Sequence, residues 1–77
     1  MQLTYDSEAN IAYIRLKNKT GKVRTVTVSN ELNIDLASDG SVYGIEFLNA
    51  NAQLRNGNKI TLINKVSGQK CELPIAV

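Results

Sequence analysis

The chain has 77 residues with one cysteine and no histidine, so there is room for one domain, and an intrachain disulfide and the common structural zinc sites are excluded. Its formal net charge of +2 is too small to indicate a polyanion partner, and nucleic-acid binding is not expected. The single thiol, together with the lack of a long apolar run, favours a cytoplasmic location without membrane contact.

Alternation of apolar and polar residues with a period of two dominates the first 48 residues and predicts half-buried strands. Polar turn residues separate these segments at short intervals, which favours an antiparallel meander in which each strand pairs with the next. The expected strands are Gln2–Asp6, Ile11–Lys17, Val23–Val28, Leu32–Ala37 and Val42–Leu48.

Register can be predicted because a slip by one residue moves every side chain of a strand to the other face. A two-residue turn at Asp39-Gly40, the strongest hairpin signal in the chain, pairs apolar residues with one another. A three-residue loop of Ser29, Asn30 and Glu31 does the same for the preceding strands. The pairs predicted by these two loops are Ile34–Ile45, Leu32–Phe47, Leu36–Tyr43 and Val26–Ile34.

These registers place the large apolar side chains on one side of the sheet, called the apolar face below. Such a face must be covered, because large exposed apolar patches are rare on monomers. The apolar face comprises Leu3, Tyr5, Ala12, Ile14, Leu16, Val26, Val28, Leu32, Ile34, Leu36, Tyr43, Ile45 and Phe47.

Residues 49–56 read as one short helix, with Asn49 as a possible N-cap and Gly57 placed to end it. The alternating runs Lys59–Asn64 and Gln69–Leu73 predict a C-terminal hairpin. The fold class expected is therefore mainly β (α+β), as a single domain over 1–77 with a meander core at 1–50 and an extension at 51–77. Ile60, Leu62 and other apolar residues of the hairpin are expected to help cover the apolar face.

Four segments of the chain resemble a known family: Leu3–Asn10, Tyr13–Leu16, Asn33–Leu36 and Gly40–Ala50. They are similar to the small bacterial YuzE-like family, a domain of unknown function. In this chain Asn10 stands where the family pattern has Asp. The resemblance implies no established reaction, but it implies frequent proximity to genes for small toxin-like proteins, and hence an antitoxin-like or regulatory role with a small protein partner.

The opposite side of the sheet, called the polar face below, carries the candidate site. Asp35 and Glu46 are predicted to be diagonal neighbours on adjacent strands, at a spacing where long side chains still meet. Paired carboxylates can share a proton or bind a cation, and the adjacent Gly44 would leave space for a ligand. With Tyr13 and Arg15 they form the candidate ligand-binding set. The alternative, which the pattern favours, is a solvated sheet face whose charges balance.

Other polar residues carry weaker signals. Asp6, Glu8 and Asn10 lack the central Gly and closing Glu of a calcium loop, so a polar turn with a side chain bonding the backbone is expected. The next loop is basic and has no aromatic residue to stack on a base, which favours a solvated loop. Its basic residues are Lys17, Lys19, Lys22 and Arg24.

No catalytic residue is predicted, because the chain lacks the His of the common hydrolytic triads and a glycine-rich phosphate loop. Cys71 has no His to activate it and is expected to be a packed side chain. We therefore expect a non-catalytic interaction module without cofactor or metal. One two-turn helix is too short to cover the apolar face, so a homodimer is predicted. The alternative function is a small-ligand or metal-binding site on the polar face.

Overall fold

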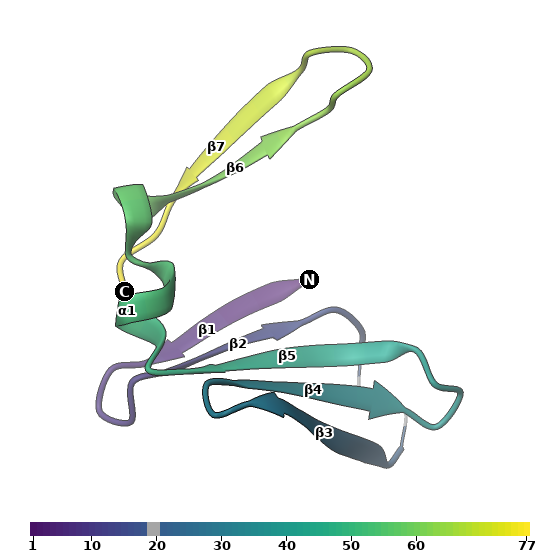
Figure 1. The fold of residues 1–77 in the computed structure, drawn as a ribbon. Helices are drawn as coiled ribbons and strands as arrows, with labels where there is room; N and C mark the ends of the chain where they lie inside the picture. Colours follow the sequence, from purple (N-terminus) through teal and green to yellow (C-terminus); the bar gives the residue numbers. More distant parts are fainter. Residues whose placement is uncertain (19–20) are drawn as a thin grey trace.

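The computed structural model describes residues 1–18 and 21–77, and Figure 1 shows a sheet, a short helical segment and a separate hairpin. The strands of the sheet are β1 (Gln2–Asp6), β2 (Ile11–Arg15), β3 (Val23–Ser29), β4 (Leu32–Ala37) and β5 (Val42–Leu48). They are followed by α1 (Ala50–Leu54), the single turn η1 (Asn56–Asn58), and the hairpin strands β6 (Lys59–Ile63) and β7 (Lys70–Pro74). No helix in the described ranges is long and apolar enough to cross a membrane.

The mainly β class is confirmed, with a five-stranded antiparallel sheet, one short helix and a C-terminal hairpin. The neighbour order differs from a simple meander, because the sheet runs β1-β2-β5-β4-β3 and β2 pairs with β5 instead of β3. This order puts β5, which contains the buried Gly44, at the centre. It puts β3, whose seven residues are all exposed, at the edge, where Arg24 blunts edge-to-edge pairing.

The β4–β5 hairpin has the predicted central register but a different turn. Ile34 lies opposite Ile45 and Leu32 opposite Phe47, as expected. The loop has three residues instead of two, because the Ala37 N–H donates to the Ser41 carbonyl and Gly40 adopts a φ of 87°. The prediction that Leu36 pairs with Tyr43 is therefore wrong: Leu36 lies opposite Val42, and a register shift restores the pairing from Asp35 onward.

The β3–β4 hairpin also keeps the predicted register, but its turn is one residue shorter than predicted. Val26 lies opposite Ile34, as predicted, but Ser29 pairs with Leu32, so the turn itself contains only Asn30 and Glu31. A register shift between Thr27 and Ser29 supplies the missing residue. In both hairpins the apolar pairing is kept by a bulge, since burial of one face constrains the register more strongly than the turn does.

Helix α1 is shorter than predicted, and the residue that caps it comes from far away in the sequence. Asn49 precedes the helix in a left-handed conformation and makes no side-chain capping bond. Instead the Asn51 N–H donates to Asn10 Oδ1 at 2.9 Å, and the Ala50 N–H donates to the Asn10 carbonyl at 3.0 Å. Asn10 thereby satisfies two free N–H groups of the first turn and ties the β1–β2 loop to the end of β5.

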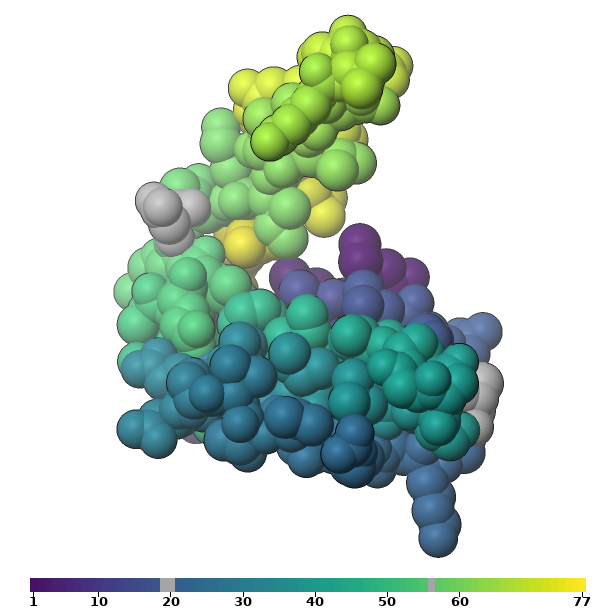
Figure 2. All heavy atoms as spheres, turned by 45° about the vertical axis from the view of Figure 1, so that its right-hand side comes forward, coloured from purple at the N-terminus to yellow at the C-terminus, as the bar shows by residue number. Residues whose placement is uncertain are grey.

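The described chain buries very little. Ala12 and Ala50 are its only buried apolar residues, and no large described side chain is fully buried. The hairpin β6–β7 rises away from the sheet instead of packing on it, and Figure 2 shows an open gap between them. The radius of gyration is 14.0 Å, whereas a compact domain of this length is expected to have a radius of about 11.5 Å. A single copy therefore leaves its apolar face largely uncovered.

Candidate functional site

The polar face carries two cross-strand rows of residues, and the order within each row follows the observed order of the strands. One row runs through Arg15, Gly44, Asp35 and Thr25. The next runs through Tyr13, Glu46, Asn33 and Thr27. Because Asp35 pairs with Gly44 and Glu46 pairs with Asn33, the two carboxylates are diagonal neighbours on β4 and β5, as expected.

Tyr13 fills the space above Gly44. An added Cβ at Gly44 would lie 2.7 Å from Tyr13 Cε1 and closer still to Cζ and the hydroxyl, so only glycine fits beneath this ring. The ring crosses from β2 over β5, and its hydroxyl donates to Asp35 Oδ2 at 2.7 Å on β4. Aromatic cover of a strand glycine of this kind holds neighbouring strands together. The space next to the carboxylates is thus occupied by the protein's own side chain.

Both carboxylates are engaged by neutral donors. Asp35 also accepts from the Thr25 hydroxyl, Oγ1 to Oδ1, at 2.6 Å, so each of its oxygens has a hydroxyl partner. Glu46 Oε1 accepts from Asn33 Nδ2 at 2.8 Å. Each carboxylate is thus oriented by its own hydrogen-bond donors, and the two are not arranged to bind one ion between them.

The Tyr13 phenol is poorly suited to give up its proton. Partial burial raises its pKa, and the hydrogen bond to Asp35 and the negative charge of that carboxylate raise it further. A phenol with a raised pKa remains a hydrogen-bond donor at neutral pH, which keeps the contact with Asp35 intact. The arrangement therefore serves as a structural clamp across β2, β5 and β4.

Arg15 lies in the same cross-strand row as Asp35 but does not take part in the hydrogen bonds of that carboxylate. Among residues 1–18 and 21–77, neither Asp35 nor Glu46 forms a salt bridge with Arg15. The structure thus brings together Tyr13, Asp35 and Thr25 in one cluster, and Asn33 and Glu46 in another. The four candidate residues therefore share one face of the sheet, with Asp35 bonded to Tyr13 and Thr25 and Glu46 bonded to Asn33.

The first loop forms the polar turn that was expected. Asp6 Oδ1 accepts the N–H groups of Glu8 and Ala9 at 3.0 and 3.1 Å. Asn10 has a different task from the one its sequence context suggests, because it holds α1, and Tyr5 also donates to its Oδ1 at 3.1 Å. Sequence reasoning missed this role, although the unusual Asn at this position is a signal of it, since Asn tolerates its φ of 57°.

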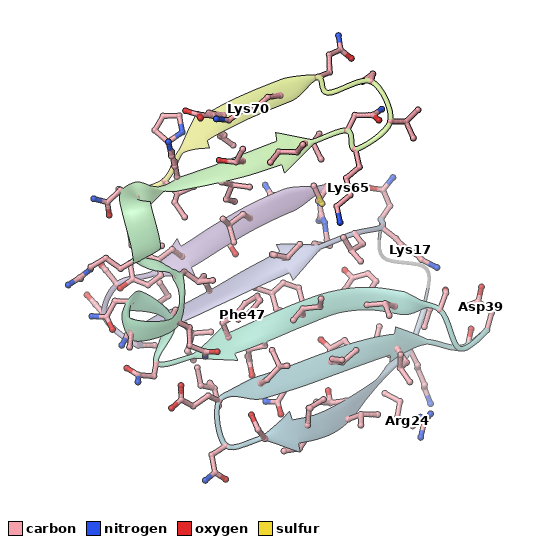
Figure 3. All side chains as sticks on the ribbon, turned by 45° about the horizontal axis from the view of Figure 1, so that its top comes forward. Lys17, Arg24, Asp39, Phe47, Lys65 and Lys70 are labelled. Atoms are coloured by element: carbon pink, nitrogen blue, oxygen red, sulfur yellow. The ribbon has the colours of Figure 1, made fainter. Side chains whose placement is uncertain are left out.

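The basic loop lies at the other end of the sheet. Lys17 donates to the Ser41 hydroxyl, while Lys22 and Arg24 are exposed near the start of β3. Lys19, also assigned to this loop, lies outside the described residues. Figure 3 shows Lys17, Arg24 and Asp39 at this same end. Hydrogen bonds from the Ser41 hydroxyl and N–H lower the pKa of Asp39, so this carboxylate remains negatively charged among the neighbouring lysine and arginine side chains.

Cys71 is exposed on the hairpin, so the expectation of a packed side chain is wrong for the single copy. The physical reason is that β6 and β7 pair with each other but not with the sheet. Cys71 lies opposite Leu62, and Ile60 lies opposite Leu73, so alternation puts all four on one side of the hairpin. That side of the hairpin is a second exposed apolar surface, in addition to the apolar face of the sheet.

Comparison with known proteins places the chain in a family. A family model described as a protein of unknown function, DUF2283, matches residues 2–51, which span the whole sheet and the first residues of α1. Searches of curated proteins and of solved structures found no match. Because the model covers most of the chain, this protein belongs to the DUF2283 family of proteins of unknown function.

Proposed function

We propose that this chain is a small non-catalytic interaction module that acts as a homodimer. The observation that carries the proposal is the lack of a core in one copy, since no large described side chain is fully buried. A chain that buries so little apolar surface cannot offset the conformational entropy lost on folding. Association through the uncovered apolar surfaces supplies the missing burial.

The accessible area supports this proposal quantitatively. The chain exposes 5822 Å², whereas a compact monomer of 8.4 kDa is expected to expose about 4,600 Å². The excess is about 1,200 Å². A stable interface of standard size buries about 800 Å² on each partner, so the excess is large enough for one interface.

The alternative, a small-ligand or metal site on the polar face, has no comparable support. Tyr13 occupies the space above Gly44, and both oxygens of Asp35 already accept hydrogen bonds. A ligand would have to displace these contacts before it reached the carboxylates. The polar face is better suited to rigidify the module than to bind a small molecule.

Light scattering coupled to size exclusion at micromolar concentration tests the dimer. The expected result is a species of twice 8.4 kDa that stays intact over a range of concentrations. Phe47→Asp and Glu46→Gln form a matched pair of neighbours on opposite faces of β5. The first should abolish the dimer and the second should leave it intact. A stable, folded species of 8.4 kDa would refute the proposal.

The resemblance to the YuzE-like family extends the proposal to a bacterial, cytoplasmic antitoxin-like or regulatory module with a small protein partner. The polar face remains solvent-facing when the apolar faces associate, so it is available to such a partner. Co-purification from the native host followed by mass spectrometry tests this extension. Recovery of the homodimer alone, at stoichiometric yield, would argue against a second protein.

A further inference from the structure

We propose that two copies of this chain exchange their β6–β7 hairpins, so that the apolar side of each hairpin packs on the apolar face of the partner's sheet. This inference rests on the proposed homodimer and specifies how it is built. It assigns an occupant to both uncovered surfaces at once, because the hairpin of one copy and the sheet of the other cover each other. The resulting interface is the same on both copies, as a two-fold dimer requires.

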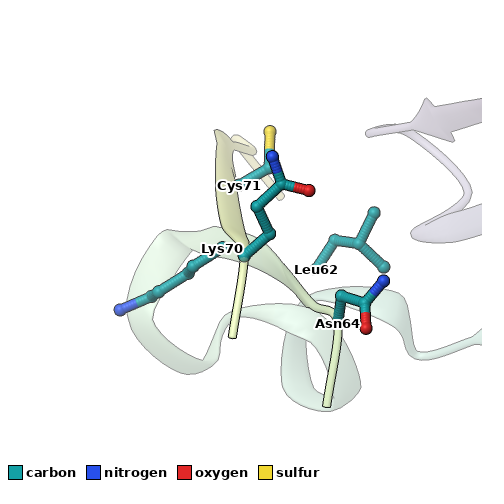
Figure 4. A pocket seen from close by; sticks show the side chains of 5 residues that line it. Leu62, Asn64, Lys70 and Cys71 are labelled. Atoms are coloured by element: carbon teal, nitrogen blue, oxygen red, sulfur yellow. The ribbon is translucent and has the colours of Figure 1, made fainter. Parts of the chain in front are cut away.

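The hairpin is amphipathic in the way that this contact requires. Its apolar side exposes Ile60, Leu62 and Leu73 at 43%, 71% and 61%. Its other side is held by ion pairs of Glu72 with Lys59 and Lys70, at 3.3 and 3.0 Å. Figure 4 shows Lys70 pointing away from Leu62. The hairpin therefore has a mostly polar side, which also carries the exposed Ile63, and an apolar side that lacks a partner.

The strands of the hairpin match the strands of the sheet in length. A shallow hollow of about 330 Å³ lies along the hairpin, with Leu62 and Cys71 in its lining (Figure 4). Each hairpin strand has five residues, which is about 17 Å, close to the length of the five- to seven-residue strands of the sheet. An isolated two-stranded hairpin is marginally stable in water, so packing on another surface is needed to hold it.

Charge distinguishes exchange between copies from closure of the hairpin on its own sheet. The sheet is acidic at the end next to α1, where Asp6, Glu8 and Glu31 outnumber Arg55. It is basic at the opposite end, where Lys17, Lys22 and Arg24 outnumber Asp39. The hairpin starts at the acidic end and runs back toward the basic end (Figure 1).

The tip of the hairpin carries Lys65, which is labelled in Figure 3. If the hairpin closed on its own sheet, this cation would approach the basic end and be repelled. In a dimer with its two-fold axis perpendicular to the strands, the hairpin of one copy runs in the opposite direction over the partner's sheet. Its tip then reaches the acidic end, where the charges attract. Exchange is the arrangement that satisfies both the apolar surfaces and the charges.

Crosslinking between exposed turn positions tests the exchange, and the only change on the proposed interface is at Cys71. All variants carry Cys71→Ala, which keeps that side of the hairpin apolar and leaves the introduced cysteines as the only thiols. Val66→Cys marks the hairpin tip, where Val66 is 99% exposed. It is combined with Ser7→Cys or Asn30→Cys, which lie in the turns of the acidic end and keep its carboxylates, or with Ser38→Cys at the basic end. Each chain is purified, checked by light scattering and treated with a short bismaleimide.

The expected result is a covalent dimer on a denaturing gel for Val66→Cys with Ser7→Cys or Asn30→Cys, at least tenfold above the corresponding single-cysteine chains. The combination with Ser38→Cys should not exceed its single-cysteine controls. A crosslink within one chain between the tip and Ser38→Cys would show closure and overturn the exchange. A dimer by light scattering without any tip-to-acidic-end crosslink would overturn the exchange but leave the homodimer standing, whereas a monomer would overturn both.

Discussion

The Tyr13–Gly44 contact makes a sharp prediction about Gly44→Ala. Replacing a strand glycine with alanine ordinarily stabilises by roughly 0.5–1 kcal/mol, because the unfolded chain loses freedom. Here the new Cβ would lie under 3.0 Å from the ring of Tyr13 and would force the ring aside. The displaced hydroxyl loses its bond to Asp35, and a hydrogen bond to a charged group contributes about 1.5–3 kcal/mol. We therefore expect Gly44→Ala to destabilise by about 1–2 kcal/mol.

A double-mutant cycle isolates this effect. In a Tyr13→Ala background the ring is absent, so Gly44→Ala should be neutral or stabilising by up to about 1 kcal/mol, a coupling near 2 kcal/mol. Tyr13→Phe retains most of the clash and serves as the matched control. Urea denaturation followed by circular dichroism, at one fixed protomer concentration, measures each free energy of unfolding. An equal cost of Gly44→Ala in both backgrounds would refute the reasoning.

Three further predictions concern the polar contacts. Asn10→Ala should lower the free energy of unfolding by about 1 kcal/mol, because α1 loses a capping acceptor. Hydrogen exchange of the first helical amides should accelerate, and unchanged exchange would contradict the capping role. Asp35→Ala should lower the free energy of unfolding, measured by urea denaturation, by about 1–3 kcal/mol, because the hydroxyls of Tyr13 and Thr25 lose their acceptor. This is more than is expected for an outward-facing carboxylate, and a loss under about 0.5 kcal/mol would count against the clamp. Since the pKa of Tyr13 is raised in the folded state, its contribution to stability is present below the ordinary tyrosine pKa and is lost as pH rises above about 10. Denaturation at about pH 9 and about pH 11 should show a smaller alkaline loss in Tyr13→Phe than in the wild type, and identical losses would argue against the shift.

The alternation of apolar and polar residues made the positions of the strands predictable from the sequence. Every strand of the sheet was located within one or two residues, because alternation of apolar and polar side chains reports directly on a half-buried strand. The pairs Ile34–Ile45 and Val26–Ile34 were found for the same reason. The turns were less predictable, because a bulge can compensate for a loop that is one residue longer or shorter.

Local patterns could not reveal which strands become neighbours beyond a hairpin. The pairing of β2 with β5 joins residues 29 to 37 positions apart in the sequence and puts β5 at the centre of the sheet. The capping of α1 by Asn10 and the cover of Gly44 by Tyr13 are consequences of that pairing. Sequence reasoning placed Tyr13 and Asp35 on the polar face but interpreted Gly44 as open space, because it could not show that a ring from β2 crosses it.

The sequence alone determined the strand positions, the division into an apolar and a polar face, and the amphipathic C-terminal hairpin, because each depends on a residue's neighbours one to four positions away. Only the tertiary structure decided the strand order, the clamp of Tyr13 on Asp35 and the separation of the hairpin from the sheet. These features depend on contacts between distant segments, whose free energies are set by packing and burial in three dimensions and leave no periodic trace in the chain.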